Sequence, residues 1–154
     1  MAGVFNLERH DGELEADLAL RAEVARLYRL TGADTVLTFD PDWAGQIHPD
    51  HRAAGRVAVD AYMPSKMPLY RPEQLVEGVG LGKVERILAF MTGEPDVVVE
   101  VTGVYEQKMA ACRAHVSQFP EGDKSLEWMK RLDEERGKKV GVRYAEMFKQ
   151  IGVW

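Results

Sequence analysis

A short β-branched and apolar run, Thr35–Phe39, constrains the fold of this chain more than any other feature. It ends at an Asp-Pro turn and lacks strict polar alternation, which is typical of a strand covered on both faces, as in a parallel sheet. An amphipathic helix is expected before it, over residues 14–31, where leucine and valine recur at spacings of three and four. A helix that leads into a covered strand predicts an α/β layered domain.

The same criteria predict the other elements of the chain. Further strands are expected over residues 84–91 and 96–101, and further helices over residues 49–62, 105–118, 125–136 and 140–151. Residues 63–82 contain three prolines and three glycines, so they predict a long surface excursion between the second helix and the second strand. Long loops of this kind often carry function.

Charge and cysteine content exclude several classes of protein. The net charge is −5 and no basic cluster is interleaved with aromatic residues, which argues against a nucleic-acid partner. No apolar run approaches the roughly 18 residues of a membrane span, and the first residues lack a signal-peptide core, so a cytoplasmic location without membrane contact is expected. Cys112 stands alone on an apolar helical stripe, which predicts a buried structural thiol.

The segment His48-Pro49-Asp50-His51-Arg52 is a dense polar cluster that follows the first strand and opens a helix. Open α/β sheets bind ligands at this position. Two imidazoles and a carboxylate can coordinate a metal, move a proton or stabilise an oxyanion, and Asp50 can hydrogen-bond an imidazole and select its tautomer. The alternative is a helix start whose histidines only satisfy backbone groups.

Together with its neighbours, this cluster resembles the PIG-L/LmbE-like zinc-dependent de-N-acetylases. The resemblance continues in the order and spacing of four further motifs. These are Thr38–Pro41, the Asp-Gly-x-Leu segment at 11–14, the strand and Lys-x-x-Ala-x-x-x-His-x-Ser-Gln helix from Asp96 to Gln118, and the Tyr-Ala-Glu-x-Phe segment at 144–148. The resemblance implies a Rossmann-like three-layer α/β/α fold with a mainly parallel sheet.

The chain departs from this family at its amino-terminal end. Family members open with a strand that ends in Ala-His-Pro-Asp-Asp, which supplies two zinc ligands and the general base, and this chain has no such motif. Residues 1–154 therefore resemble the carboxyl-terminal two-thirds of one deacetylase domain, N-terminally incomplete. A bare sheet edge is expected, which favours a homo-oligomer or a complementing chain.

The resemblance also implies roles for individual residues. His51 is the retained ligand of zinc or another divalent metal, His48 polarises the amide carbonyl, and Asp50 tunes His48. Arg52 and His115 are expected to contact the substrate. The implied substrate is an N-acetylglucosamine-type amino sugar or conjugate, which is hydrolysed to acetate and a free amine.

Two questions stay open at this stage. In the loop before His48, Asp40 and Asp42 either form turns or touch substrate, and Trp43 is either a sugar-stacking platform or an anchor for the loop. The chain as a whole is either a deacetylase or a non-catalytic binding module or partner-dependent subunit that retains half of the site. A third possibility is an unrelated α/β protein whose His-Pro-Asp-His segment is accidental.

Overall fold

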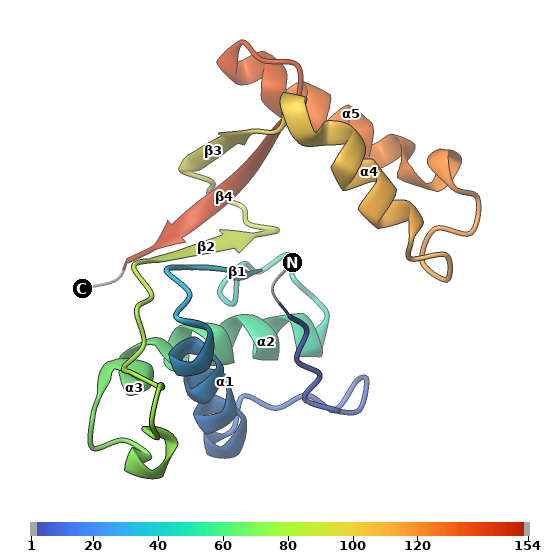
Figure 1. Cartoon of the computed structure of the whole chain (residues 1–154). Helices are drawn as coiled ribbons and strands as arrows, with labels where there is room; N and C mark the ends of the chain where they lie inside the picture. Colours follow the sequence, from blue (N-terminus) through green and yellow to red (C-terminus); the bar gives the residue numbers. More distant parts are fainter. Residues whose placement is uncertain (1–2, 153–154) are drawn as a thin grey trace. The chain divides into compact units, whose positions relative to one another are not determined.

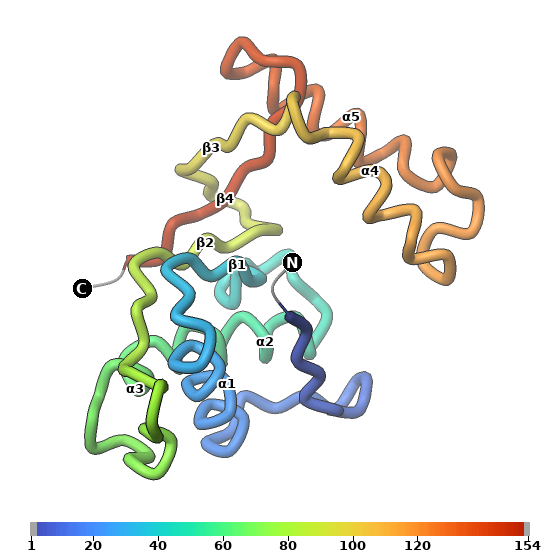
Figure 2. The backbone as a smooth tube through the Cα atoms, viewed as in Figure 1, coloured from blue at the N-terminus to red at the C-terminus, as the bar shows by residue number. Residues whose placement is uncertain are grey.

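The computed structural model of the chain describes residues 3–152. These residues divide into two compact units, one that extends to Glu94 and resumes at Lys149, and one that runs from Pro95 to Phe148 (Figures 1 and 2). Each unit contains its own cluster of buried apolar side chains. None of the described helices is both long enough and apolar enough to cross a membrane.

The first unit is built on a parallel pair of strands that three helices cover. Its elements are α1 (Leu18–Thr31), β1 (Thr35–Phe39), α2 (Pro49–Asp60), α3 (Tyr62–Lys66), a 3-10 turn η1 (Pro72–Gln74) and β2 (Arg86–Phe90). β1 pairs in parallel with β2, starting with Thr35 opposite Arg86. The α/β class is therefore confirmed.

Helix α1 begins four residues later than expected because of its amino-terminal cap. The Asp17 carboxylate accepts a hydrogen bond from the Leu20 N–H at 2.7 Å, which satisfies a donor that the first turn leaves free. Gly32 ends the helix in a left-handed conformation, with φ +60°, as expected for a glycine at this position. Ala25 and Tyr28 of this helix pack in the core with Ile87 of β2.

The outer edge of β1 has no strand partner among residues 3–152, where the strand order is β1-β2-β4-β3. Val36 packs against the helical core of the unit, whereas Leu37, the next residue, is 60% exposed. An unpaired edge beside an exposed leucine is a surface on which another strand can add.

A buried arginine holds the excursion that follows α3. The side chain of Arg29 on α1 is 3% exposed, and its guanidinium donates only to oxygen atoms of this excursion. The acceptors are the backbone carbonyls of Pro64, Ser65, Met67, Tyr70 and Arg71 and the side-chain oxygen of Gln74, at 2.9 to 3.3 Å. One planar group thus ties the end of α3, the loop that follows it and η1 to helix α1.

Strand β4 (Ala145–Ile151) occupies a segment that the sequence pattern assigned to a helix. Its last residues pair antiparallel with β2, and residues 145–148 pair antiparallel with β3 (Val97–Glu100). The prediction of a helix over 140–151 is therefore wrong, and the sheet is mixed, since only β1 and β2 are parallel. Pairing with distant strands overrides local helical spacing here.

In the second unit, the helix expected over 125–136 is longer than predicted and runs to Val140. The remaining elements of this unit are a 3-10 turn η2 (Thr102–Val104), α4 (Tyr105–Arg113) and α5 (Asp123–Val140). Helix α5 continues through Gly137, where a Cβ atom would lie 2.7 Å from the Val142 carbonyl oxygen. Gly137 therefore marks a close backbone approach inside a helix and not a break between helices.

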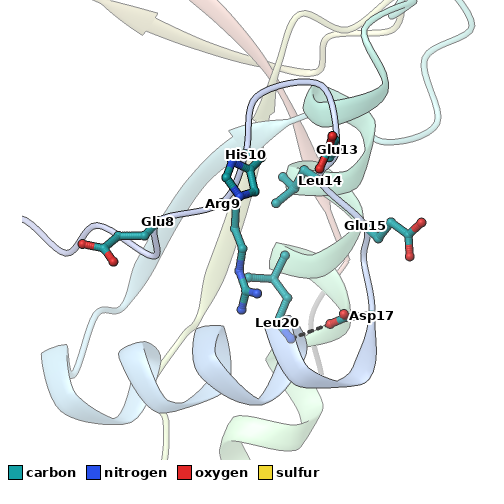
Figure 3. Close-up of a pocket in the computed structure, with 8 residues that line it drawn as sticks. All are labelled: Glu8, Arg9, His10, Glu13, Leu14, Glu15, Asp17 and Leu20. Carbon is teal, nitrogen blue, oxygen red and sulfur yellow. Dashed lines mark hydrogen bonds between the residues drawn. The ribbon is translucent and has the colours of Figure 1, made fainter.

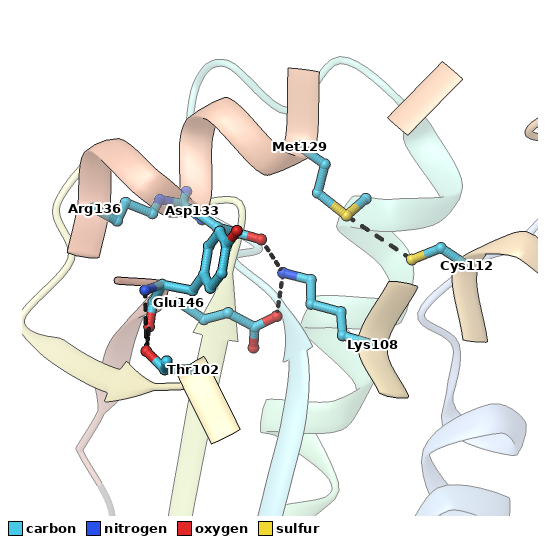
Figure 4. A network of polar contacts seen from close by, with 8 residues as sticks. Thr102, Lys108, Cys112, Met129, Asp133, Arg136 and Glu146 are labelled. Carbon is cyan, nitrogen blue, oxygen red and sulfur yellow. Dashed lines mark hydrogen bonds and ion pairs between the residues drawn. The ribbon is translucent and has the colours of Figure 1, made fainter. Parts of the chain in front are cut away.

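An ion-pair network centred on the buried Asp133 ties α4 and α5 to β4 (Figure 4). The ammonium of Lys108 lies 2.6 Å from an oxygen of Asp133, which is 1% exposed, and 2.5 Å from an oxygen of Glu146. Burial opposes the charged ammonium, but its hydrogen bonds to both carboxylates outweigh that effect and raise the pKa of Lys108 above its ordinary value. This network fixes the second unit.

We expect Arg29→Ala to lower the free energy of unfolding by about 3 kcal/mol, because it leaves several buried carbonyls without donors. Urea unfolding measures this loss, and limited proteolysis should show faster cleavage within residues 64–74. Arg26→Ala, an exposed position on the same helix, is the matched control. Equal stability of the two variants would contradict the stabilising role of the Arg29 hydrogen bonds.

We expect Lys108→Met to destabilise the protein by about 3 kcal/mol, because it leaves the buried Asp133 carboxylate with only the more distant guanidinium of Arg136, at 3.9 Å. A second change, Asp133→Asn, should recover part of that loss by removing the stranded charge. Thermal unfolding checks both, with the exposed Lys130→Met on α5 as control. A Lys108→Met protein as stable as this control would refute the network.

Candidate functional site

The predicted His-Pro-Asp-His segment lies at the amino-terminal end of α2, in the first unit. β1 ends at Phe39, and the loop that follows leads to His48, the residue before the helix. Pro49 occupies the first helical turn, where its missing N–H costs nothing. The chain therefore presents both imidazoles beside the carboxyl end of a strand that pairs in parallel, as expected.

The two imidazoles stack on each other and on an aromatic ring from β1. The ring centroids of His48 and His51 lie 4.4 Å apart at an interplanar angle of 17°. The ring of Phe39 covers the other side of His51, at 3.9 Å and 9°. The histidines thus share one environment, and the Phe39 ring limits how His51 can turn.

Gln46 determines the tautomer of His51. Its side-chain oxygen accepts the backbone N–H of His48 at 3.2 Å. Because a backbone N–H can only donate, this bond shows which end of the Gln46 amide is the oxygen. The same oxygen lies 3.2 Å from Nδ1 of His51. Nδ1 must therefore be the protonated nitrogen, which leaves the lone pair of Nε2 free to bind a cation or accept a proton.

His48 is held in the opposite tautomer. Its Nδ1 accepts the backbone N–H of Asp50 at 3.2 Å and caps the amino-terminal end of α2. The remaining proton of the neutral ring must then lie on Nε2, which becomes a hydrogen-bond donor. The alternative of a histidine that only satisfies a backbone group is thus correct for Nδ1 of His48. Its Nε2 stays available.

Asp50 has a different role from the one expected. Its carboxylate accepts the backbone N–H groups of Gly12, at 2.6 Å, and Leu14, at 3.2 Å. It is the backbone N–H of Asp50, and not its carboxylate, that bonds His48. The expectation that this carboxylate tunes His48 through a direct bond is thus corrected, because two main-chain donors of the amino-terminal turn occupy it.

The electrostatics favour a neutral His51. Burial and the neighbouring His48 lower the pKa of His51 from its ordinary value of 6.5, and the charge of Asp50 opposes them only in part. A neutral imidazole is the form that binds a metal ion. Both the neutral charge state and the tautomer of His51 therefore favour metal binding through Nε2.

Two other predicted site residues are exposed. Arg52 is exposed on the first turn of α2. His115 is exposed and belongs to the second unit, in the turn after α4, because the helix expected over 105–118 ends at Arg113. The structure thus brings together His48, Asp50 and His51.

The amino-terminal segment forms a hollow of about 380 Å³ beside α1 (Figure 3). Arg9 and His10 line it together with acidic side chains, and Arg9 pairs with Glu23 at 2.5 Å. The Asp50 carboxylate holds the turn at Gly12 that closes this segment. The hollow therefore depends on the same helix start that carries the two imidazoles.

Sequence reasoning missed Gln46, although this residue is 4% exposed and contacts both histidines. It stands two residues before His48 in a loop, and glutamine is common in loops for many reasons. Only the folded geometry identifies it. The described residues contain no group of three or more His, Cys, Asp or Glu side chains placed to hold a metal ion.

No family model matches the chain. It is 31% identical over 145 residues to a diacetylchitobiose deacetylase from Thermococcus kodakarensis, an alignment that covers 93% of this chain and 54% of that protein. It is also 31% identical over 112 residues to a probable N-acetyl-alpha-D-glucosaminyl L-malate deacetylase 2 from Bacillus cereus, covering 73% and 45%.

A solved structure resembles the chain to a similar extent. The N,N'-diacetylchitobiose deacetylase from Pyrococcus horikoshii, in complex with its inhibitor, matches with a TM-score of 0.81 and 30% identity, over 94% of this chain and 55% of that one. The relatives are thus diacetylchitobiose deacetylase and related deacetylases. The chain spans about half the length of the curated relatives it matches.

We expect Gln46→Ala to release the tautomer of His51, because the acceptor for its Nδ1 proton is lost. Long-range proton–nitrogen NMR should show His51 protonated at Nδ1 and titrating below its ordinary pKa in the unmodified protein. The tautomers should mix in the variant. An unmodified His51 that carries its proton on Nε2 would show that Gln46 does not control it.

Proposed function

We propose that the chain is a deacetylase segment of the PIG-L/LmbE-like type, which acts on the acetamido group of an N-acetylglucosamine-type sugar or conjugate. The similarity to named deacetylases supports the reaction class. The observation that carries the proposal is the stacked pair of histidines in opposite tautomers, one offering a lone pair and the other an N–H.

His51 is the residue we assign to a divalent metal, most plainly zinc. The free lone pair on Nε2 and the lowered pKa fit a zinc ligand. A catalytic zinc normally has three protein ligands, and residues 3–152 do not supply a set of that size. The chain by itself does not fit a complete zinc site, and we infer that the other ligands come from outside these residues.

His48 is the residue we assign to the carbonyl oxygen of the substrate. Its Nε2–H is the donor that the capping bond leaves free. Amide hydrolysis adds water across the carbon–nitrogen bond, so negative charge develops on the carbonyl oxygen before acetate and a protonated amine separate. A donor aimed at this oxygen stabilises the charge, and Pro49 and the helix start hold the donor in place.

A second candidate function is a partner-dependent subunit or non-catalytic binding module. Two observations favour it: the incomplete metal ligand set within the described residues and the unpaired edge of β1. A strand from another chain that adds to this edge would lie beside the loop that carries the histidines. A permanently non-catalytic module, by contrast, would bind sugar without any hydrolysis.

We expect acetate release from N,N'-diacetylchitobiose when this chain is mixed, in the presence of zinc, with the part of the Thermococcus relative that it does not match. His48→Ala should lower kcat by about 10² to 10³, as the loss of an oxyanion donor does. His51→Ala should abolish turnover, and Arg26→Ala should leave it unchanged. An enzymatic assay of released acetate gives the rate for the unmodified chain and for the three variants.

The outcomes separate the two candidates. Acetate release by this chain alone would overturn the inference that its ligand set is incomplete. Failure of the mixture to release acetate, with both chains folded and associated, would exclude the enzyme and leave the binding module.

A further inference from the structure

A second cavity, of about 390 Å³, lies in the first unit where β1 and β2 end. Both strands run in the same direction, so the loops that follow them meet at one edge of the sheet. Its walls include Asp40, Asp42 and Trp43 from the loop after β1, Gly93 and Glu94 from the segment after β2, and Lys149 of β4. The loop that forms one wall continues directly to Gln46 and the two imidazoles.

Gly45 and Gly93 pack closely against the indole of Trp43. A Cβ atom at Gly93 would lie 2.9 Å from Cδ1 and Nε1 of the indole, and a Cβ at Gly45 would collide with the opposite end of the ring. The Trp43 carbonyl accepts the backbone N–H of Gln46 at 2.9 Å. The side chain is half-buried, so the ring is fixed by its surroundings while it lines the cavity.

The charges in this cavity do not cancel. Asp42 pairs with Arg56, and Glu94 pairs with Lys149 at 3.3 Å. Asp40 is 4% exposed and takes part in none of the ion pairs of the described residues; its one described side-chain bond is from the N–H of Asp42, at 3.0 Å. The described ion pairs therefore leave the charge of the Asp40 carboxylate unbalanced at the wall of the cavity.

We propose that this cavity binds a hexosamine ring with a free, protonated amine. The apolar C–H face of a pyranose stacks on a fixed indole, and the ammonium group supplies the missing cation for Asp40. If the proposed function holds, the cavity receives a second sugar ring beside the one that loses its acetyl group. A disaccharide whose second ring is already deacetylated should then be preferred to N,N'-diacetylchitobiose, in which both rings carry an acetyl group.

The test is a titration of the full chain with glucosamine, followed by tryptophan fluorescence. A background that carries Trp128→Phe and Trp154→Phe leaves Trp43 as the single tryptophan of the sequence. We expect saturable binding in this background and no saturable signal when Trp43→Phe is added. Asp40→Asn, which retains the acceptor for the Asp42 N–H, should weaken glucosamine binding at least tenfold, and uncharged N-acetylglucosamine should bind as weakly to the unmodified chain.

A second variant keeps the test decisive if Asp40→Asn fails to fold. Gly93→Ala adds a methyl group against the indole and should also weaken binding at least tenfold, with an unchanged circular dichroism spectrum. Equal affinity for glucosamine and N-acetylglucosamine, or no binding at all, would overturn the proposal.

The His51→Ala variant separates this proposal from the proposed function. It should bind glucosamine as the unmodified chain does, even if no protein mixture ever releases acetate. Loss of glucosamine binding in His51→Ala would place the sugar at the imidazoles and refute a separate site in the cavity.

Discussion

The side-chain oxygen of Gln46 is the interaction on which the account of this site depends. It accepts from the backbone of His48 and from the ring of His51, so one buried atom fixes both the start of α2 and the tautomer of the second imidazole. The capping bond from Asp50 to His48 then sets the other tautomer. Two identical side chains three residues apart thereby differ in what Nε2 offers. His51 offers a lone pair for a ligand bond, and His48 offers an N–H donor.

The sequence predicted the elements that local chemistry controls. Thr35–Phe39 is a strand with the expected bounds, and α2 starts at Pro49, because a β-branched run and a proline at the first turn act within a few residues. The helix predicted over 140–151 followed from apolar residues at helical spacing, and it is wrong because β4 pairs with β2 and β3, which are distant in the chain. The helix expected over 125–136 stops one residue before Gly137, whereas α5 continues through it, because the close approach of Gly137 to Val142 exists only after folding.

The candidate site shows the same division. The His-Pro-Asp-His segment was recognisable from residue types at short spacing, whereas Gln46 and the carboxylate bonds of Asp50 to residues 12 and 14 were not. The open choice for Trp43 is answered in part, since it is anchored by two glycines and also lines a cavity. The parallel pairing of β1 with β2 brings this cavity to the sheet edge from which the loop to the histidines leaves.

The central claim is that His51 offers Nε2, and only Nε2, to a metal ion. Crystals of the chain soaked with zinc and measured at the zinc absorption edge test it directly. The account predicts an anomalous peak roughly 2.0–2.1 Å from Nε2 of His51, with Gln46 still bonded to Nδ1. Zinc bound through Nδ1, or bound at other side chains while the ring of His51 stays free, would contradict it.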